Sequence, residues 1–115
     1  MKLSEHQAAF LLDACKLIQY ATQQGWTVTG GELFRTLDQQ KIYFDAGKSK
    51  TMQSNHLRRL AIDLNFLKDG QLVMDKKALQ AVGDYWESLN PLCRWGGNWT
   101  SFIDTPHFER NVQVP

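Results

Sequence analysis

Apolar and polar residues alternate strictly in the middle of the chain. Between positions 60 and 66 every second residue is large and apolar, and the residues between them are Ala61, Asp63 and Asn65. This period of two is typical of a half-buried strand, because successive side chains of a strand point to opposite faces. The pattern therefore predicts a strand with one face in the core and Asp63 on the other face, beside the small Ala61.

A helical pattern opens the chain. Ser4 and Gln7 have the spacing of a capping box and Gly25 is a typical C-terminal stop, so we expect a helix over residues 4–24. His6, in its first turn, is expected to be exposed to solvent and is not counted as a metal ligand. The stripe expected to face the core consists of Leu11, Leu12, Cys15, Ile18 and Thr22.

Two more helices follow from local signals. Thr36 and Gln39 form a second capping box, which predicts a helix that ends at Gly47. Asp75 is expected to cap a third helix that continues to about Leu89. The buried stripe of this third helix should consist of Leu79, Val82, Tyr85, Trp86 and Leu89.

The remaining elements are short strands and turns. Asp69-Gly70 favours a tight turn, so residues 72–74 should return antiparallel to the central strand, and residues 26–29 should form another strand. Together the patterns predict an α+β fold, with about three helices packed on a small, mainly antiparallel sheet. With 115 residues, we expect one domain over 1–115.

Charge argues against two classes of partner. The chain has 13 basic and 12 acidic residues and a net charge of +1, so neither nucleic acid nor an anionic membrane is expected to bind. A small nucleic-acid-binding domain that uses Arg58 and Arg59 is an alternative, disfavoured by this balance and by the strand-like pattern around them. No apolar repeat requires a partner subunit, and we expect a monomer.

The first residues lack the apolar core of a signal peptide, since Met1-Lys2-Leu3 is followed directly by polar residues. No stretch reaches transmembrane length. We therefore expect synthesis in the cytoplasm. A protein of this kind that acts outside the cytoplasm, for example in the periplasm, would depend on another agent for its release.

The two cysteines, Cys15 and Cys93, do not have the spacing of a metal site. Cys15 is expected to be a small buried hydrophobic residue of the first helix. A disulfide between the two is a less favoured alternative.

Two imidazoles and two carboxylates are the candidate chemical groups. His56 is too far from Asp63 to share its strand face, so it must come from the turn that feeds the strand. Pro106 disfavours a helical pairing of Asp104 with His107 and instead predicts a turn, with His107 as the first residue of a last strand. A catalytic zinc ion takes three nitrogen or oxygen ligands, which His56, Asp63 and His107 could supply, leaving Asp104 as a general base. Each of these histidines alone would more often be an ordinary surface or hydrogen-bonded residue.

Arg35 is a second candidate group. Its planar guanidinium could bind a substrate carboxylate or a developing oxyanion, although a simple ion pair with Glu32 explains it equally well. The polar segment 48–53 is expected to form a rim that delivers Ser54, which could contact substrate or merely cap a turn.

Several motifs together resemble a known family. Ser54-x-His56 with Ala61-x-Asp63, then Trp95-Gly96-Gly97-Asn98-Trp99, then Asp104-x-x-His107, are similar to motifs of the LAS-type zinc peptidases. This family includes D-alanyl-D-alanine carboxypeptidases, D-Ala-D-Ala dipeptidases and phage L-alanyl-D-glutamate endolysins, with the Hedgehog/DD-peptidase fold. The resemblance is closest to short phage and prophage forms.

The resemblance implies roles for individual residues. It implies that Zn²⁺ is held by His56, Asp63 and His107, and that Asp104 is the catalytic base. Arg35 would be catalytic and substrate-binding, and we assign Ser54 and Trp95 to substrate binding; of the two loop tryptophans, one should pack on the core and the other should wall the cleft. The family often has Gly three residues after the first His, where this chain has Arg59, and we expect the larger side chain to alter the turn and narrow the cleft.

The expected function is hydrolysis of peptidoglycan stem peptides by a zinc peptidase, with cleavage of L-Ala-D-Glu favoured. A D-alanyl-D-alanine carboxypeptidase or dipeptidase is an alternative with the same machinery. A cell-wall-binding module without catalysis is a third possibility.

Overall fold

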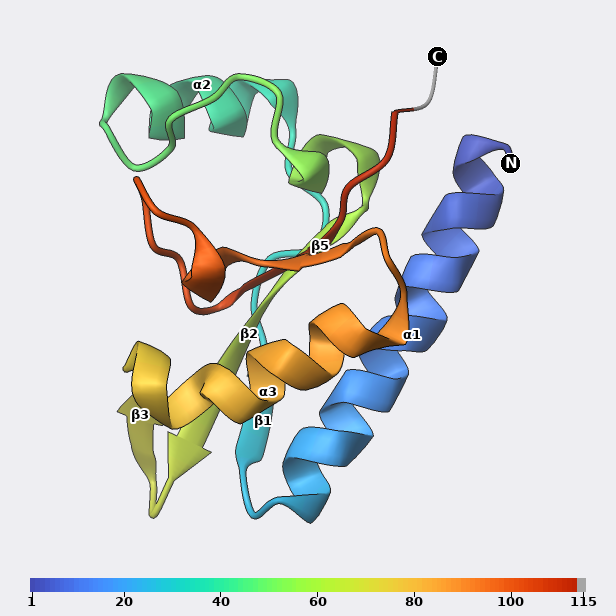
Figure 1. Ribbon diagram of the computed structural model, residues 1–115. Coiled ribbons are helices and arrows are strands. Elements are labelled where there is room, and N and C mark those ends of the chain that lie inside the picture. Colours follow the sequence, from blue (N-terminus) through green and yellow to red (C-terminus); the bar gives the residue numbers. More distant parts are fainter. Residues whose placement is uncertain (114–115) are drawn as a thin grey trace.

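The sheet is organised around β2 (Ala61–Lys68), the strand expected from the alternating pattern (Figure 1). In this computed structural model, which describes residues 1–113, β2 lies between β1 (Thr27–Gly30) and β5 (His107–Arg110). β4 (Cys93–Trp95) extends the sheet beyond β5, and β3 (Gln71–Val73) forms a hairpin with the end of β2. All four pairings are antiparallel, which confirms the predicted α+β class.

The two faces of β2 differ as the alternation predicted. Leu64 and Phe66 are buried in the core, together with Leu60 just before the strand. Phe66 and Phe108 pack edge to face with ring centroids 5.8 Å apart. Asp63 has the opposite parity, so it lies on the face of the sheet away from these rings.

Two helices cover the apolar face of the sheet. α1 (Leu3–Gln23) and α3 (Lys76–Leu89) cross one another in Figure 1, and Phe10 of α1 packs edge to face on Trp86 of α3. Trp86 also packs on Phe108 of β5, which ties both helices to the sheet. α2 (Leu37–Asp45) lies apart from them at the top of the view, beyond the ends of β2 and β5.

The capping and turn signals in the sequence predicted α2, α3 and the β2–β3 hairpin, which the structure contains. The Thr36 side chain accepts a hydrogen bond from the Gln39 amide, and Asp75 accepts one from the Ala78 amide. The hairpin turn has positive φ at Asp69 and Gly70, as a tight antiparallel connection requires. None of the helices within residues 1–113 combines the length and hydropathy that a bilayer crossing needs.

The first helix differs from its prediction in where it begins and in its buried face. Glu5 bonds back to the Lys2 amide, so the helix starts before Ser4. Leu11 and Leu12 are 53% and 65% exposed, and Cys15 is exposed as well. The buried stripe is His6, Phe10, Asp13, Ala14, Leu17 and Ala21. The predicted stripe was wrong for Leu11, Leu12, Cys15 and Thr22, whereas Ile18 does pack against the core. His6, expected to be exposed, is buried, because His6 and Asp13 face a buried arginine and so lie on the core side.

The buried arginine is Arg110 of β5. Its Nε donates to His6 Nδ1 at 3.0 Å, and its Nη1 lies 3.9 Å from an oxygen of Asp13. Cys93, also buried, donates its thiol to the same Asp13 oxygen. Both cysteines are free, so the alternative of a disulfide between Cys15 and Cys93 is wrong.

Candidate metal centre

Asp63 and His107 are brought together by the strand register. They are direct partners across the antiparallel β2–β5 pair, a position in which side chains on one face lie close together. On the other side of Asp63, the Gly31 amide donates to its carbonyl at 2.7 Å. A Cβ atom at Gly31 would lie only 3.1 Å from the Asp63 Cβ, so a glycine allows this close approach.

His56 enters the site from a single turn of 3-10 helix, Asn55–Arg58, immediately before β2. The Ser54 hydroxyl caps this turn by accepting a hydrogen bond from the His56 amide. The prediction that His56 comes from the turn that feeds the strand is therefore confirmed.

The hydrogen bonds of His56 leave one of its nitrogens free for a cation. Nδ1 lies 3.0 Å from the Leu33 carbonyl oxygen, which can only accept, so Nδ1 is the donor there and a neutral ring has its lone pair on Nε2. Nε2 is buried, has no hydrogen-bond partner within residues 1–113, and lies 3.3 Å from Oδ1 of Asp63. A lone pair and a carboxylate oxygen at this distance repel one another unless a cation lies between them.

His107 is oriented by Glu109, two residues along the same strand face. Its Nε2 lies 2.7 Å from Glu109 Oε1, which directs Nδ1 toward Asp63 Oδ1 at 3.8 Å. Glu109 is itself buried and pairs across the strands with Ala61, whose small side chain leaves it room. A carboxylate that holds the second nitrogen of a ligand histidine is the usual outer partner in metal sites.

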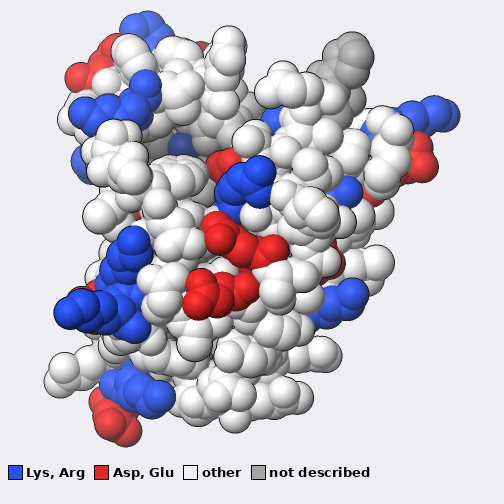
Figure 2. All heavy atoms as spheres, in the orientation of Figure 1, with Lys and Arg blue, Asp and Glu red and all other residues white. Residues whose placement is uncertain are grey.

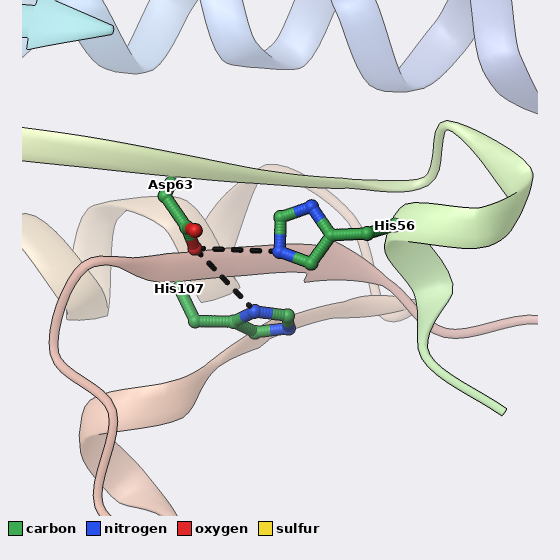
Figure 3. Close-up of side chains that lie close together, drawn as sticks. All are labelled: His56, Asp63 and His107. Carbon is green, nitrogen blue, oxygen red and sulfur yellow. Dashed lines mark ion pairs between the residues drawn. The ribbon is translucent and has the colours of Figure 1, made fainter. Parts of the chain in front are cut away.

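Figure 3 shows the resulting arrangement, in which both imidazoles approach the Asp63 carboxylate from different sides. One ligand atom from each of His56, Asp63 and His107 lies within 4.8 Å of the others. Two neutral imidazole nitrogens and one carboxylate oxygen form a donor set that fits a catalytic zinc ion. The unpartnered His56 nitrogen is the observation that fits a bound metal best.

The centre opens into a cleft of about 560 Å³. Figure 2 shows this face of the molecule hollowed beneath α2, with basic side chains along the α2 side. Asp104, Arg35 and Ser54 all line the cleft together with the three candidate ligands.

Asp104 is half-buried in the turn before β5. Its amide donates to the Gly96 carbonyl and its carbonyl accepts from the His107 amide, so the turn predicted from Pro106 is present. A Cβ at Gly96 would come within 2.3 Å of the Asp104 carbonyl oxygen, which explains the need for glycine there. Burial raises the pKa of the Asp104 carboxyl; His107 opposes the rise and Asp63 adds to it.

Arg35 both forms the simple ion pair and borders the cleft. Its Nε bonds to Glu32, its guanidinium lies 4.7 Å from the centre of the Tyr43 ring, and its side chain is only 11% exposed. Nη1 also reaches the Ser54 hydroxyl at 3.5 Å. The two expectations for Ser54, a cap and a cleft residue, are therefore compatible.

The two loop tryptophans have different environments. Trp95 is completely buried, donates its indole N–H to the Thr105 carbonyl and packs against Gly83 and Gly97. Its assignment to substrate binding is wrong, because its ring fills the core. Trp99 lines the cleft instead, with its ring 4.8 Å from that of His107.

Comparisons with known proteins show to which family this chain belongs. Residues 47–110 match the family described as D-alanyl-D-alanine carboxypeptidase. The chain belongs to this family. An L-alanyl-D-glutamate peptidase of Listeria phage A118 is 33% identical over 104 residues, and the match covers 87% of this chain. The chain spans only 36% of the length of that phage relative.

One solved structure has the same fold as this chain. The Serratia marcescens L-Ala D-Glu endopeptidase ChiX superposes with a TM-score of 0.69, over 96% of this chain and 87% of ChiX. The sequence identity is 23%.

Arg59 stands where the family often has a glycine. Its backbone has φ 55° and ψ 38°, the left-handed conformation that glycine adopts without steric cost. Its side chain does not line the cleft; the guanidinium lies 4.3 Å from the centre of the Phe34 ring. The expectation that this side chain narrows the cleft is wrong, because the Arg59 side chain packs on Phe34, outside the cleft lining.

Glu109 and Trp99 are the site residues that sequence reasoning did not assign. A signal for Glu109 was present, since residues i and i+2 of a strand share a face and His107 was expected to open one. The sequence could not distinguish the roles of Trp99 and Trp95, because they are the two ends of one Trp-Gly-Gly-Asn-Trp segment and only their packing in the fold differs.

Proposed function

We propose that this chain is a zinc-dependent peptidase that hydrolyses the L-Ala-D-Glu bond of peptidoglycan stem peptides. The observation that carries the proposal is the convergence of His56, Asp63 and His107 at the floor of a cleft that Asp104 and Arg35 also line. The choice of bond is supported by the activities for which the phage A118 peptidase and ChiX are named.

Zinc is the metal that this donor set favours, with two imidazoles, one carboxylate and an open side toward the cleft. When bound, it would supply a Lewis acid and a nucleophilic water with a pKa lowered to about 7.

The chain's own groups would handle protons and charge. Asp104, with its raised pKa, is suited to take up a proton during attack and to pass it to the departing amine. Arg35 would donate to the developing negative oxygen or to a carboxylate of the substrate. Ser54 would contact the substrate beside Arg35, and Trp99 would exclude water from the His107 side.

The proposed partner is therefore the stem peptide of peptidoglycan, bound by a monomer, since every group in the proposal comes from one chain. The proposed place of action is the cell wall.

Mass spectrometry of purified sacculi incubated with the zinc-loaded protein tests the function. Stem peptides with a free D-Glu amino terminus are the expected product. Loss of only a terminal D-Ala would instead identify a D-alanyl-D-alanine carboxypeptidase. The Asp104→Ala variant is the control, and it should retain zinc while turnover falls by at least about 100-fold. Unchanged muropeptides despite stoichiometric zinc would refute catalysis on this substrate and favour a wall-binding module.

A further inference from the structure

Gln40 is a completely buried polar residue on a helix whose other residues are exposed or half-buried. It is 0% exposed, and it is the buried residue of α2, whose apolar side chains Leu37 and Ile42 are more than half exposed. A buried amide is costly unless its oxygen and both N–H groups find partners. The partners of Gln40 therefore indicate why this position is polar.

All of these partners border the cleft. Gln40 Oε1 accepts from Nη1 of Arg35 at 2.8 Å, and Nε2 donates to the Ser49 hydroxyl at 2.9 Å and to the Thr51 carbonyl. The orientation of the amide is unambiguous, because a guanidinium can only donate and a carbonyl can only accept.

Ser49 and Thr51 belong to the segment 48–53, which we call the rim loop. This loop has no helix or strand of its own, yet Lys48, Ser49, Lys50, Thr51 and Gln53 all line the cleft. It leads directly into Ser54 and the turn that carries His56. The Gln40 amide thus joins two parts of the cleft wall that lie outside the sheet, Arg35 and the rim loop.

We propose that Gln40 is a positioning residue that holds the rim loop and the Arg35 guanidinium in the geometry that binds the substrate. The inference rests on the proposed peptidase function. Gln40 does not itself line the cleft, so it acts through its hydrogen-bond partners. Without it, Arg35 would keep its ion pair with Glu32 through Nε but lose the acceptor that orients Nη1, and the rim loop would lose the side-chain donor that fixes it.

The two halves of the amide can be separated by substitution. Gln40→Glu keeps an acceptor for Arg35 but removes the N–H donors to Ser49 and Thr51. The Gln40→Met side chain has a similar length and removes both the acceptor for Arg35 and the N–H donors to the rim loop. Gln39→Met is the matched control, because it makes the same change on the neighbouring residue of α2, whose side chain is not part of the proposed contacts.

Kinetics on a soluble stem peptide that contains the L-Ala–D-Glu bond should distinguish the variants. For Gln40→Glu we expect KM to rise about 10-fold with kcat nearly unchanged, because the loop is released while Arg35 stays in place. For Gln40→Met we expect kcat to fall as well, by about 10-fold to 100-fold, because a displaced guanidinium no longer meets the reacting group. Gln39→Met should match the wild type in both constants.

Hydrogen exchange and zinc content accompany the kinetics. In both Gln40 variants, amides of the rim loop should exchange faster than in the wild type, while the β2 amides and the zinc content stay unchanged. Wild-type kinetics and wild-type exchange in the rim loop would overturn the proposal. Equal losses in the two variants, with faster exchange throughout the sheet, would also overturn it, since Gln40 would then only support the fold.

The failure of the proposed function would look different. If the wild-type protein cleaved no stem peptide, the function would fall, whereas rim-loop exchange in the Gln40 variants would still test the hydrogen-bonded coupling in the zinc-loaded protein.

Discussion

Asp63 and His107 face each other across β2 and β5, with Oδ1 and Nδ1 3.8 Å apart. Two of the three candidate ligands are therefore fixed by sheet register and the third, His56, by one short helical turn. Sites built on strands hold their geometry better than sites built on loops. Substitutions at these positions should change metal binding more than they change the fold.

Replacing Asp63 by Asn should release most of the zinc. Asn keeps the shape of Asp but removes the charge that the two imidazoles share. We expect the zinc content per chain to fall well below one, with an unchanged far-ultraviolet circular dichroism spectrum, as measured by metal analysis after gel filtration. Asn65→Ala, two residues along the same face, is the control and should keep its zinc; equal zinc in both variants would contradict the site.

Glu109 should control zinc affinity through His107. Because Glu109 Oε1 holds the His107 ring at 2.7 Å, Glu109→Ala should weaken zinc binding by about 10-fold to 100-fold. Glu109→Gln retains a hydrogen-bond acceptor for His107 and should therefore weaken zinc binding less. Competition with a chromophoric chelator measures both affinities, and an order opposite to this one would exclude the orienting role.

The two tryptophans should differ in what their loss affects. Trp95→Leu should lower the free energy of unfolding by about 3 kcal/mol, because it leaves a cavity between Gly83 and Phe108. Trp99→Leu should change the free energy of unfolding by less than about 1 kcal/mol, as expected for a partly exposed residue. The same substitution should reduce stem-peptide cleavage by about 10-fold. Urea titrations and peptide assays on both variants test this contrast. A stability loss as large for Trp99→Leu as for Trp95→Leu would argue against it.

His6 should make the protein less stable in mild acid. Burial lowers its pKa below 6.5; the Arg110 guanidinium, the amino terminus and Arg58 lower it further, and Glu5 opposes them. The unfolded chain therefore takes up a proton at His6 more readily than the folded chain. The stability that the neutral ring contributes is complete above about pH 6.5 and is lost as the pH falls toward the lowered pKa.

The pH effect of His6 is measured by difference. Urea midpoints at about pH 7.5 and about pH 5.5 should differ more for the wild type than for His6→Gln, which keeps an acceptor for Arg110 but does not titrate. Equal differences in the two proteins would assign the acid sensitivity to other groups.

The cysteines should react at very different rates. Burial raises the pKa of the Cys93 thiol to about 12, so almost none of it is the reactive thiolate at neutral pH. Cys15 is exposed on α1. Mass spectrometry after treatment with iodoacetamide should find one label per native chain, at Cys15, and two labels in denaturant. Early labelling of Cys93 in the native protein would contradict its burial.

Elements with local signals could be predicted from the residue pattern alone. Alternation from 60 to 66 predicted β2, the Thr36 and Asp75 caps predicted α2 and α3, and Asp69-Gly70 predicted the hairpin. These signals depend on backbone hydrogen bonds and side-chain direction within a few residues, so they can be interpreted without knowing the rest of the fold. Ligand chemistry and the family resemblance, not these local signals, selected His56, Asp63 and His107, which the structure brings together.

Only the tertiary structure decided which side chains these elements bury. The apolar leucines of α1 face solvent because His6 and Asp13 meet Arg110, a residue about a hundred positions away in sequence. Trp95 rather than Trp99 enters the core for the same kind of reason, since it fills the space left by glycines of two different elements. Burial is a property of the partner surface as much as of the residue, and that surface exists only once distant segments have packed together.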